Sequence, residues 1–434
     1  MKTNHVKQLI LGLLIPLVFA NCTPDTTQQI AHLTDYQQYL KVTATERVAT
    51  IQKEIDFWQN KFDGAPNQSS YLITLAAYYS ELFEVTGVIT HLYKAEQLLI
   101  EANEKFGEQE ASIHRAIARN YITQHRFKEA LTYLEKAEKL GANKIGTQKM
   151  LFDVHMELGN YRLAKEQLTA IQSPNDFDYL IRVAKWNDHN GQLETAITSM
   201  EKAMKIAENE NNQALKLWVY SNIGDFYGHA GRIEDSYAYY LKTLKEDPSN
   251  TYALKGIAWI AFSHDRNAEQ ALEIIRSIET KRVSPELYLI KATIAEFQAN
   301  ELEQAKALFN YNEQLAVYKY GVMYHTYTIE LMAENPKYVE DALKLAQIEI
   351  QNRPTPASYD LLAWCYLKKG DKEKAFEVVQ THTLGKSFEP TILYHTAEIL
   401  KANNQTAAVA PLKKELLASL YELGPLYESK IRNL

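Results

Sequence analysis

The sequence has few of the residues that interrupt a regular backbone. Its 434 residues include only 16 glycines and 12 prolines, about half the usual combined share. This scarcity favours helices, because glycine and proline are the residues that helix interiors tolerate least. Hydrophobic residues make up 46% and charged residues 23%, which excludes a disordered chain, a collagen-like chain and a multispan membrane protein.

Long basic runs are also missing. The formal net charge is a mild −7, and no stretch of Lys and Arg is long enough to follow a phosphate backbone. We therefore expect no nucleic-acid partner.

Cysteine is nearly absent, since the chain has only Cys22 and Cys365. Cys365 lies in the helical phrase AWCYL, where a single cysteine is expected to be a small buried side chain. A disulfide between the two is the alternative. It is disfavoured because Cys22 lies in a polar leader far from Cys365 in the sequence.

The first 21 residues are predicted to be a signal peptide. Lys2 and Lys7 precede an apolar run of 12 residues, 9–20, which is too short for a membrane span and typical of an export signal. The run ends Phe-Ala-Asn-Cys at residues 19–22 and resembles a bacterial lipobox. That resemblance implies that Cys22 is lipidated and that a flexible leader, 22–36, follows it. The protein would then be anchored in the bacterial cell envelope, at the outer membrane.

Ordinary cleavage remains an alternative to lipidation. Asn21 departs from the Gly or Ala that a lipobox prefers, and Val18-x-Ala20 suits ordinary signal peptidase. Cleavage after Ala20 would release a secreted or periplasmic protein.

A helical repeat pattern occupies most of the chain. It is clearest in residues 220–248, with matching stretches at 359–375 and 151–168. The first stretch follows W-x2-L-G-x2-Y...A-x3-F...P with these residues: Tyr220, Ile223, Gly224, Tyr227, Gly231, Ile233, Ser236, Tyr240 and Pro248. This resembles the tetratricopeptide repeat family, which implies an all-α fold, an α-solenoid that winds stacked helix pairs into a right-handed superhelix.

The spacing of the small residue in each second helix measures the repeat. The positions are Ala95, Ala130, Ala164, Ala196, Ser236, Ala271, Ala305, Ala342, Ala375 and, weakly, Ala407. Most steps lie close to the expected 34 residues. We therefore predict an N-terminal capping helix at 37–66, a repeat array at 67–408, and a C-terminal capping helix at 409–434 that breaks at Gly424-Pro425.

Catalytic motifs are missing from the sequence. It contains no H-E-x-x-H, G-x-S-x-G, P-loop or G-x-G-x-x-G pattern, and its 12 histidines include no pair spaced to hold a metal from one helix. We expect no enzyme activity, no catalytic residues, no metal and no cofactor.

In tetratricopeptide arrays the first helices line a concave groove, and the resemblance implies its residues here. They are Arg115, Arg119, Lys149, Asp153, Lys185, His189, Trp218, Asn222, Asp225 and His229. Four cations on three successive helices predict a groove for an anionic peptide or a carboxylate. The alternative is an ordinary solvated helix surface, which carries the same residue types.

Two further features bear on the partner. Asn222 resembles the asparagine of the co-chaperone carboxylate clamp, but Ile181 and Lys185 stand where the clamp requires Lys and Asn, so chaperone-tail binding is not expected. The next section of groove is apolar, which would suit a mixed peptide or a helix, and consists of Leu287, Ile290, Ile294 and Phe297. The sequence therefore predicts a non-catalytic scaffold that binds a protein or peptide, without naming the partner.

Overall fold

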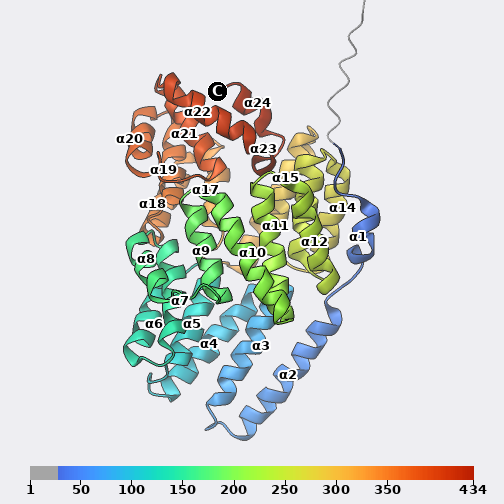
Figure 1. The fold of residues 1–434 in the computed structure, drawn as a ribbon, viewed down its shortest axis with the longest axis vertical. Coiled ribbons are helices and arrows are strands. Elements are labelled where there is room, and N and C mark those ends of the chain that lie inside the picture. Colours follow the sequence, from blue (N-terminus) through green and yellow to red (C-terminus); the bar gives the residue numbers. More distant parts are fainter. Residues whose placement is uncertain (1–27) are drawn as a thin grey trace, which may run out of the picture.

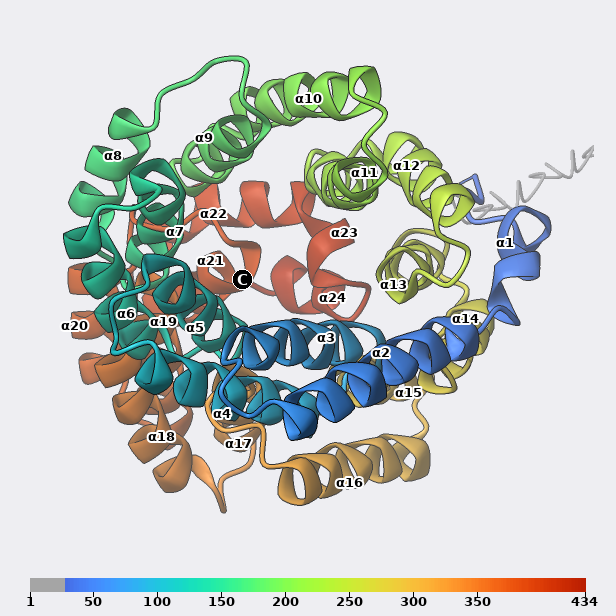
Figure 2. The ribbon, with the colours of Figure 1, turned by 90° about the horizontal axis from the view of Figure 1, so that it is seen from below.

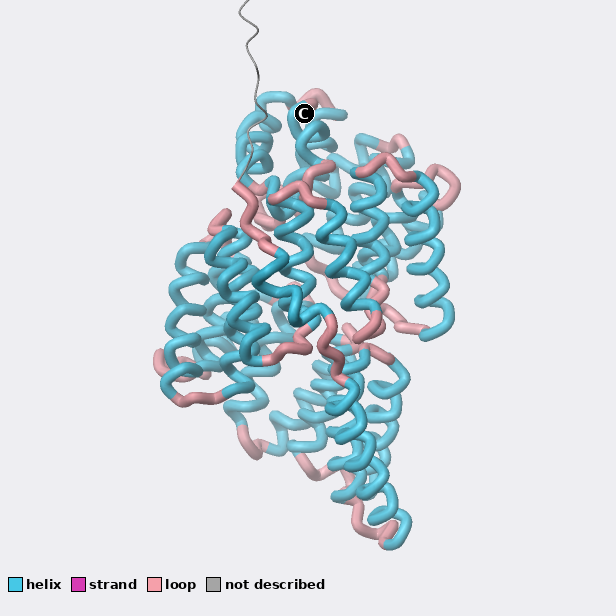
Figure 3. Tube along the Cα trace, turned by 90° about the vertical axis from the view of Figure 1, so that its right-hand side faces the viewer, coloured by secondary structure: helices cyan, strands magenta, loops and turns pink. Residues whose placement is uncertain are grey.

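The computed structural model describes residues 28–434, and these form a solenoid of α-helices without a β-strand (Figures 1 and 3). The predicted signal peptide, 1–21, and Cys22 lie outside the described residues. Twenty of the helices form ten consecutive antiparallel pairs: α3 (Ser70–Thr86) with α4 (Ile89–Lys105), α5 (Ala111–Thr123) with α6 (Phe127–Leu140), α7 (Lys144–Glu157) with α8 (Tyr161–Ala170), α9 (Phe177–His189) with α10 (Leu193–Asn209), α11 (Gln213–His229) with α12 (Ile233–Glu246), α13 (Thr251–Trp259) with α14 (Ala268–Glu279), α15 (Glu286–Phe297) with α16 (Glu301–Tyr318), α17 (His325–Ala333) with α18 (Val339–Asn352), α19 (Pro356–Lys369) with α20 (Lys372–His382), and α21 (Pro390–Ala402) with α22 (Thr406–Ala418). The predicted fold class is confirmed.

Eight of the ten small residues used to measure the repeat are fully buried on the second helix of their pair. They are Ala95, Ala130, Ala164, Ala196, Ser236, Ala271, Ala342 and Ala375, each with a relative exposure of 0%. A small side chain here lets the two helices approach closely, and neighbouring pairs then complete the core.

The register prediction is wrong for α16. Ala305 is exposed, and the buried residues are Ala307 and Tyr311. Both Ala305-x3-Phe309 and Ala307-x3-Tyr311 satisfy the alanine-aromatic pattern, so the sequence alone could not separate them. The exposed fractions show which register the helix adopts, because Phe309 is 63% exposed whereas Tyr311 is fully buried.

The last pair shows the same shift of two residues. Ala407 is exposed and Val409 is buried. Val409 follows Ala375 by 34 residues, so the regular period continues into α22.

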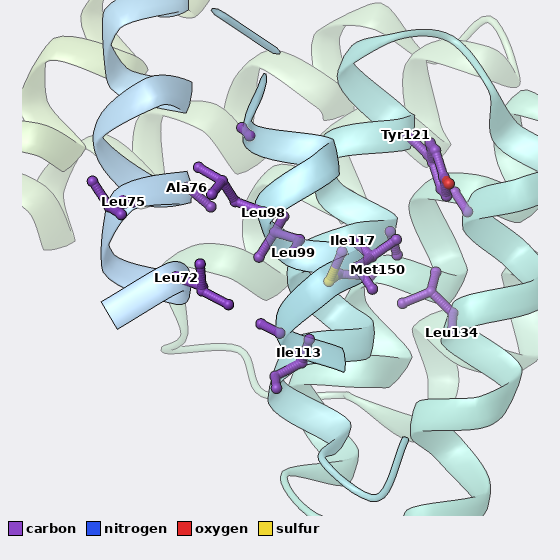
Figure 4. Close-up of a cluster of buried hydrophobic side chains, with 14 of the residues drawn as sticks. Leu72, Leu75, Ala76, Leu98, Leu99, Ile113, Ile117, Tyr121, Leu134 and Met150 are labelled. Carbon is purple, nitrogen blue, oxygen red and sulfur yellow. The ribbon is translucent and has the colours of Figure 1, made fainter. Parts of the chain in front are cut away.

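The first hydrophobic core joins the capping helix α2 (Thr45–Gly64) to the first pairs. Figure 4 shows side chains such as Leu72, Ile117 and Leu134 meeting between consecutive helices. Ile51 and Ile55 of α2 are buried in this cluster, as the predicted apolar stripe requires. Capping by α2 buries the apolar face that the first pair would otherwise expose.

The N-terminal boundaries differ from the prediction. A helix α1 (Leu33–Leu40) begins inside the segment assigned to the leader, and residues 41–44 separate it from α2. Tyr36 is fully buried against α12 and α14. Its hydroxyl accepts a hydrogen bond from Gln270, and Tyr237 donates to the backbone oxygen of His32. The residues 28–40 therefore pack on the middle of the solenoid, more than 200 positions away in the sequence.

The C-terminal segment breaks at Gly424-Pro425 as predicted, into α23 (Leu420–Leu423) and α24 (Tyr427–Arg432). The predicted boundary between 408 and 409 is wrong, because α22 crosses it as the second helix of the last pair and ends at Ala418, where a further break precedes α23. Seen from below, α22 to α24 lie behind the opening of the ring formed by the preceding helices (Figure 2), and Figure 1 places them at the upper end of the molecule. α23 contacts α11 and the π-helical turn η1 (Ile260–His264). Trp259 Nε1 and Ser263 Oγ donate hydrogen bonds to the Tyr421 carbonyl oxygen, at 2.9 and 2.6 Å. The chain's own end thus fills part of the concave side.

The two halves of the solenoid also contact each other directly. The Val283 backbone N–H donates to the Thr86 carbonyl oxygen at 2.8 Å, immediately beside Gly87. Arg353 lies 3.6 Å from Glu157. These contacts join α3 to α8 with α14 to α19. No helix of residues 28–434 is long and apolar enough to cross a membrane.

Candidate partner-binding surface

The predicted arginines lie on α5 beside a hollow between α3 and α5. Arg115 Nη1 donates to the Ala142 carbonyl oxygen at 2.7 Å and to Thr147 Oγ1 at 3.3 Å. Arg119 lines the hollow, of about 710 Å³, together with Arg47 and Glu84. The Arg119 guanidinium forms no hydrogen bond or ion pair with the residues that the structure describes, although the Arg119 carbonyl oxygen accepts from Thr123. It is therefore available to an anionic partner, whereas Arg115 also holds the next loop.

The two predicted lysines already have anionic partners. Lys149 Nζ lies 3.0 Å from Asp176 and 2.9 Å from Asp178, and Lys185 Nζ lies 2.8 Å from Glu157. Burial alone would lower the pKa of Lys185, but the nearby charge of Glu157 outweighs it and raises the pKa above its usual value. Both lysines are charged and neutralised within the chain.

A cation that the sequence prediction missed lies between them. Arg182 Nη2 forms a 2.6 Å ion pair with Asp153 and its Nε donates to the Lys149 carbonyl oxygen at 3.0 Å. The sequence could have indicated this pair, because Arg182 follows Asp153 by 29 residues and so lies opposite it on the next first helix. The anionic-peptide interpretation of this groove thus concerns a surface whose positive charges are mostly compensated.

Four predicted residues line a hollow of about 420 Å³ between α7, α9 and α11, namely Asp153, Lys185, Trp218 and Asn222. The Trp218 ring is 41% exposed, which suits contact with a partner. Asn222 Nδ2 donates to the Trp218 carbonyl oxygen at 2.7 Å, so this amide stabilises its own helix. His189 stacks on Tyr161 with ring centroids 4.1 Å apart, and burial lowers the pKa of His189.

Asp225 and His229 make intrachain contacts. The Tyr240 hydroxyl donates to Asp225 at 2.5 Å, and Tyr252 donates to its other oxygen. His229 Nδ1 contacts Glu422 of α23. Burial alone would lower the pKa of His229, but the hydrogen bond and charge of Glu422 outweigh it and raise the pKa to about 9. The protonated His229 therefore holds the C-terminal segment.

The predicted apolar section of groove is mostly core. Leu287 and Ile294 are buried, at 2% and 0% exposure. Phe297 packs edge to face on Phe262, with ring centroids 5.5 Å apart. Among the four residues predicted for this section, Ile290 is the one that lines a cavity on the concave side.

Two further hollows adjoin each other on the concave side, and the predicted residues Asp225, His229 and Ile290 line one of them. A central cavity of about 500 Å³ lies between α11, α13, α15 and α23, and its polar and aromatic lining includes Asp225, Tyr252, Trp259, Glu286, Tyr327, Glu389 and Tyr421. A terminal cavity of about 1000 Å³ lies between α15, α17, α19, α21 and α24, and its lining includes Tyr327, Glu330, Glu334, Trp364, Tyr394 and Tyr427. Leu289, Thr293 and Tyr327 line both, so the two cavities adjoin.

Glu330 is the notable carboxylate of the terminal cavity. It makes no hydrogen bond or ion pair with residues 28–434, whereas Glu334 accepts from Trp364 Nε1 at 2.9 Å and pairs with Lys368 at 2.6 Å. Burial raises the pKa of Glu330, and Asp360 and Glu334 add to this effect. The charges of His395 and Lys430 oppose it.

A buried acid-base pair lies beside this cavity. His395 Nδ1 is 2.7 Å from Asp360, and the His395 ring stacks on Trp364 with centroids 3.9 Å apart. Both members are less than 3% exposed. Cys365 is fully buried, which confirms its predicted role in packing, and burial raises the pKa of its thiol to about 12. Within the described part of the chain, no three His, Cys, Asp or Glu side chains are grouped to hold a metal.

Comparison with known proteins shows similarity in solved structures. No family model and no curated protein matches the sequence. Similar structures include human IFIT1, in a dimer with PPP-AAAA, with 13% identity, a TM-score of 0.48, and coverage of 76% of this chain and 77% of that one. A tetratricopeptide repeat protein from Parabacteroides merdae has 16% identity, a TM-score of 0.39, and coverage of 58% and 96%. Yeast Tom70 has 11% identity, a TM-score of 0.39, and coverage of 89% and 91%. The likeness concerns the arrangement of helices, and the described residues form a solenoid of antiparallel helix pairs.

Proposed function

We propose that this protein is a non-catalytic scaffold that binds a protein or peptide on its concave side. The observation that carries the proposal is the set of hollows there, which are lined by the first helices of successive pairs. A repeat array holds such side chains on rigid elements, so little ordering entropy is lost on binding.

The groove is tested by reversing charge on α5. The double variant Arg115→Glu, Arg119→Glu should reduce recovery of the partner in a pull-down from the native organism by at least about fivefold, because the change disfavours an anionic partner. Arg162→Glu on α8, where Arg162 is highly exposed, is the matched control and should leave recovery unchanged. Equal recovery with the double variant and the control contradicts the role of this hollow.

We also propose attachment to the bacterial envelope through lipidated Cys22. The apolar run 9–20 and the Cys22 that follows it support this location. A tethered scaffold there would suit a role in assembling a protein complex of the envelope. Cys22→Ala should move the protein from the membrane fraction to the soluble fraction and abolish labelling by a fatty-acid analogue.

The second candidate is a secreted or periplasmic accessory protein, which the Val18-x-Ala20 sequence favours. Under that alternative, native protein is already soluble and Cys22→Ala changes nothing. Sequencing the mature N-terminus distinguishes cleavage after Ala20 from cleavage before Cys22.

A further inference from the structure

Within the terminal cavity, Tyr327 and Glu330 lie one turn apart on α17 and share a face. Both line the cavity. The Tyr327 side chain is 42% exposed, and within residues 28–434 no Lys or Arg lies over its ring. An exposed aromatic ring beside a carboxylate without a counter-ion is a combination that recognises a cation.

The same cavity contains an internal example of this recognition. Lys368 pairs with Glu334 at 2.6 Å and lies over the Trp364 ring, 4.4 Å from its centroid. Its ammonium group thus receives both an ion pair and a cation–π contact. Glu334 and Trp364 are satisfied by this lysine, whereas Glu330 and Tyr327 have no equivalent partner in the described chain.

The fold gives Glu330 no direct counter-ion among the described residues. Its side chain is partly exposed and faces a cavity of about 1000 Å³. The nearest acid-base pair gives little relief, because His395 is already bound to Asp360 at 2.7 Å. Lys430 also lines the cavity, and its charge acts on Glu330 without forming an ion pair with it. The Glu330 carboxylate is therefore open to a ligand in this cavity.

We propose that the terminal cavity binds a basic side chain, Lys or Arg, of a polypeptide partner, with Glu330 as its counter-ion and Tyr327 as its cation–π surface. The inference rests on the proposed peptide-binding function and assigns a basic residue to the part of the partner that enters this cavity, separately from the anionic part tested at α5. The adjoining central cavity gives the rest of the peptide room. Of the acids that line it, Glu286 is paired with Lys255 and Glu422 with His229, whereas Glu389 has no ion pair among the described residues. The unpaired acids Glu330 and Glu389 favour a basic segment over an acidic one along this path.

Tetralysine amide is the test ligand, and its binding to the full mature chain is measured by calorimetry at low and high salt. Wild-type protein should bind with an affinity that falls as salt increases. Glu330→Gln keeps the shape and removes the charge, and should weaken binding at least tenfold. Tyr327→Leu should weaken it about threefold. Glu313→Gln removes an exposed carboxylate on α16 and should bind like wild type.

The melting temperature separates a binding role from a structural one. Glu330→Gln should melt at the same temperature as wild type or higher, because it removes an uncompensated charge. A lower melting temperature together with unchanged binding means that Glu330 is structural and overturns the inference.

Three other outcomes also contradict the inference: no binding of tetralysine at millimolar concentration, equal binding by Glu330→Gln and Glu313→Gln, or tighter binding of tetraglutamate than of tetralysine. The pull-down with the Arg115 and Arg119 variant is independent of them. If partner recovery still depends on those arginines while tetralysine fails to bind, the proposed scaffold function stands and only the basic-peptide assignment is wrong.

Discussion

Two lysines on the concave surface of the N-terminal half have counter-ions within the chain, whereas a glutamate of the C-terminal half has none within residues 28–434. On α7 and α9, Lys149 and Lys185 are paired with carboxylates within 3.0 Å. On α17, Glu330 has no partner among the described residues. A charged residue in a groove is therefore informative about a ligand only when the fold itself supplies no counter-ion.

The repeat spacing explains the difference. In the N-terminal half, the ion-paired residues are 27 to 29 positions apart, which brings adjacent first helices face to face: Lys149 with Asp176 and Asp178, Asp153 with Arg182, and Glu157 with Lys185. At 27 to 29 positions after Glu330 the sequence has Ala357, Ser358 and Tyr359, none of which is charged. The next residue, Asp360, is itself an acid and is paired with His395, so the pairing pattern fails at this repeat.

The largest expected effect comes from separating the two halves. In Gly87→Ala the new Cβ would lie 1.9 Å from the Val283 carbonyl oxygen, and the backbone has a φ of +71°. We expect the free energy of unfolding to fall by about 3 kcal/mol, measured by urea denaturation. Gly141→Ala shares the positive φ but has open space, and should lose only about 1 kcal/mol. Equal losses would show that the contact between halves contributes nothing.

The next effect tests the shifted register of the C-terminal half. Ala307→Leu should lower the free energy of unfolding by about 2 kcal/mol, because Ala307 is 3% exposed and has no room for a larger side chain. Ala305→Leu, on the exposed side of the same helix, should change it by less than about 0.5 kcal/mol. A larger loss of unfolding free energy for Ala305→Leu than for Ala307→Leu would show that Ala305 is the packing position after all.

A smaller effect is expected on removing one of the ion-paired lysines of the N-terminal half. Lys149→Met should lower the free energy of unfolding by about 1 kcal/mol, since Asp176 and Asp178 lose a shared partner. Chemical denaturation measures the loss, which is opposite in sign to the effect expected for Glu330→Gln. A stabilised Lys149→Met protein would contradict the contrast between the two surfaces.

The smallest effect concerns the contact between His229 and the C-terminal segment. The pKa of His229 is about 9 in the folded protein and about 6.5 in the unfolded chain. The stabilisation of the fold by protonated His229 is therefore complete below pH 6.5 and is lost as pH rises towards 9. The melting temperature of wild type should fall over this range by more than that of His229→Gln. Parallel pH profiles of the two proteins would show that this ion pair does not stabilise the fold.

The helix pairs were predictable because their signals are local and periodic. The small residues from Ala95 to Ala271 lie where the pattern requires, and the stripe on α2 buries Ile51 and Ile55. The register of α16 was not predictable, because Phe309 and Tyr311 both complete an alanine-aromatic pattern. The predicted groove residues were assigned to first helices correctly, but the pattern does not say which carboxylates face them.

The sequence by itself determined an all-helical repeat array and the break at Gly424-Pro425, because helix periodicity, small-residue spacing and backbone restriction act over a few tens of residues. The tertiary structure alone decided that Val283 meets Thr86, that Glu422 meets His229 across 193 positions, and that the Glu330 carboxylate has no ion pair within residues 28–434. Small differences in each repeat accumulate into the superhelix, so contacts between its ends depend on the whole chain and on no single motif.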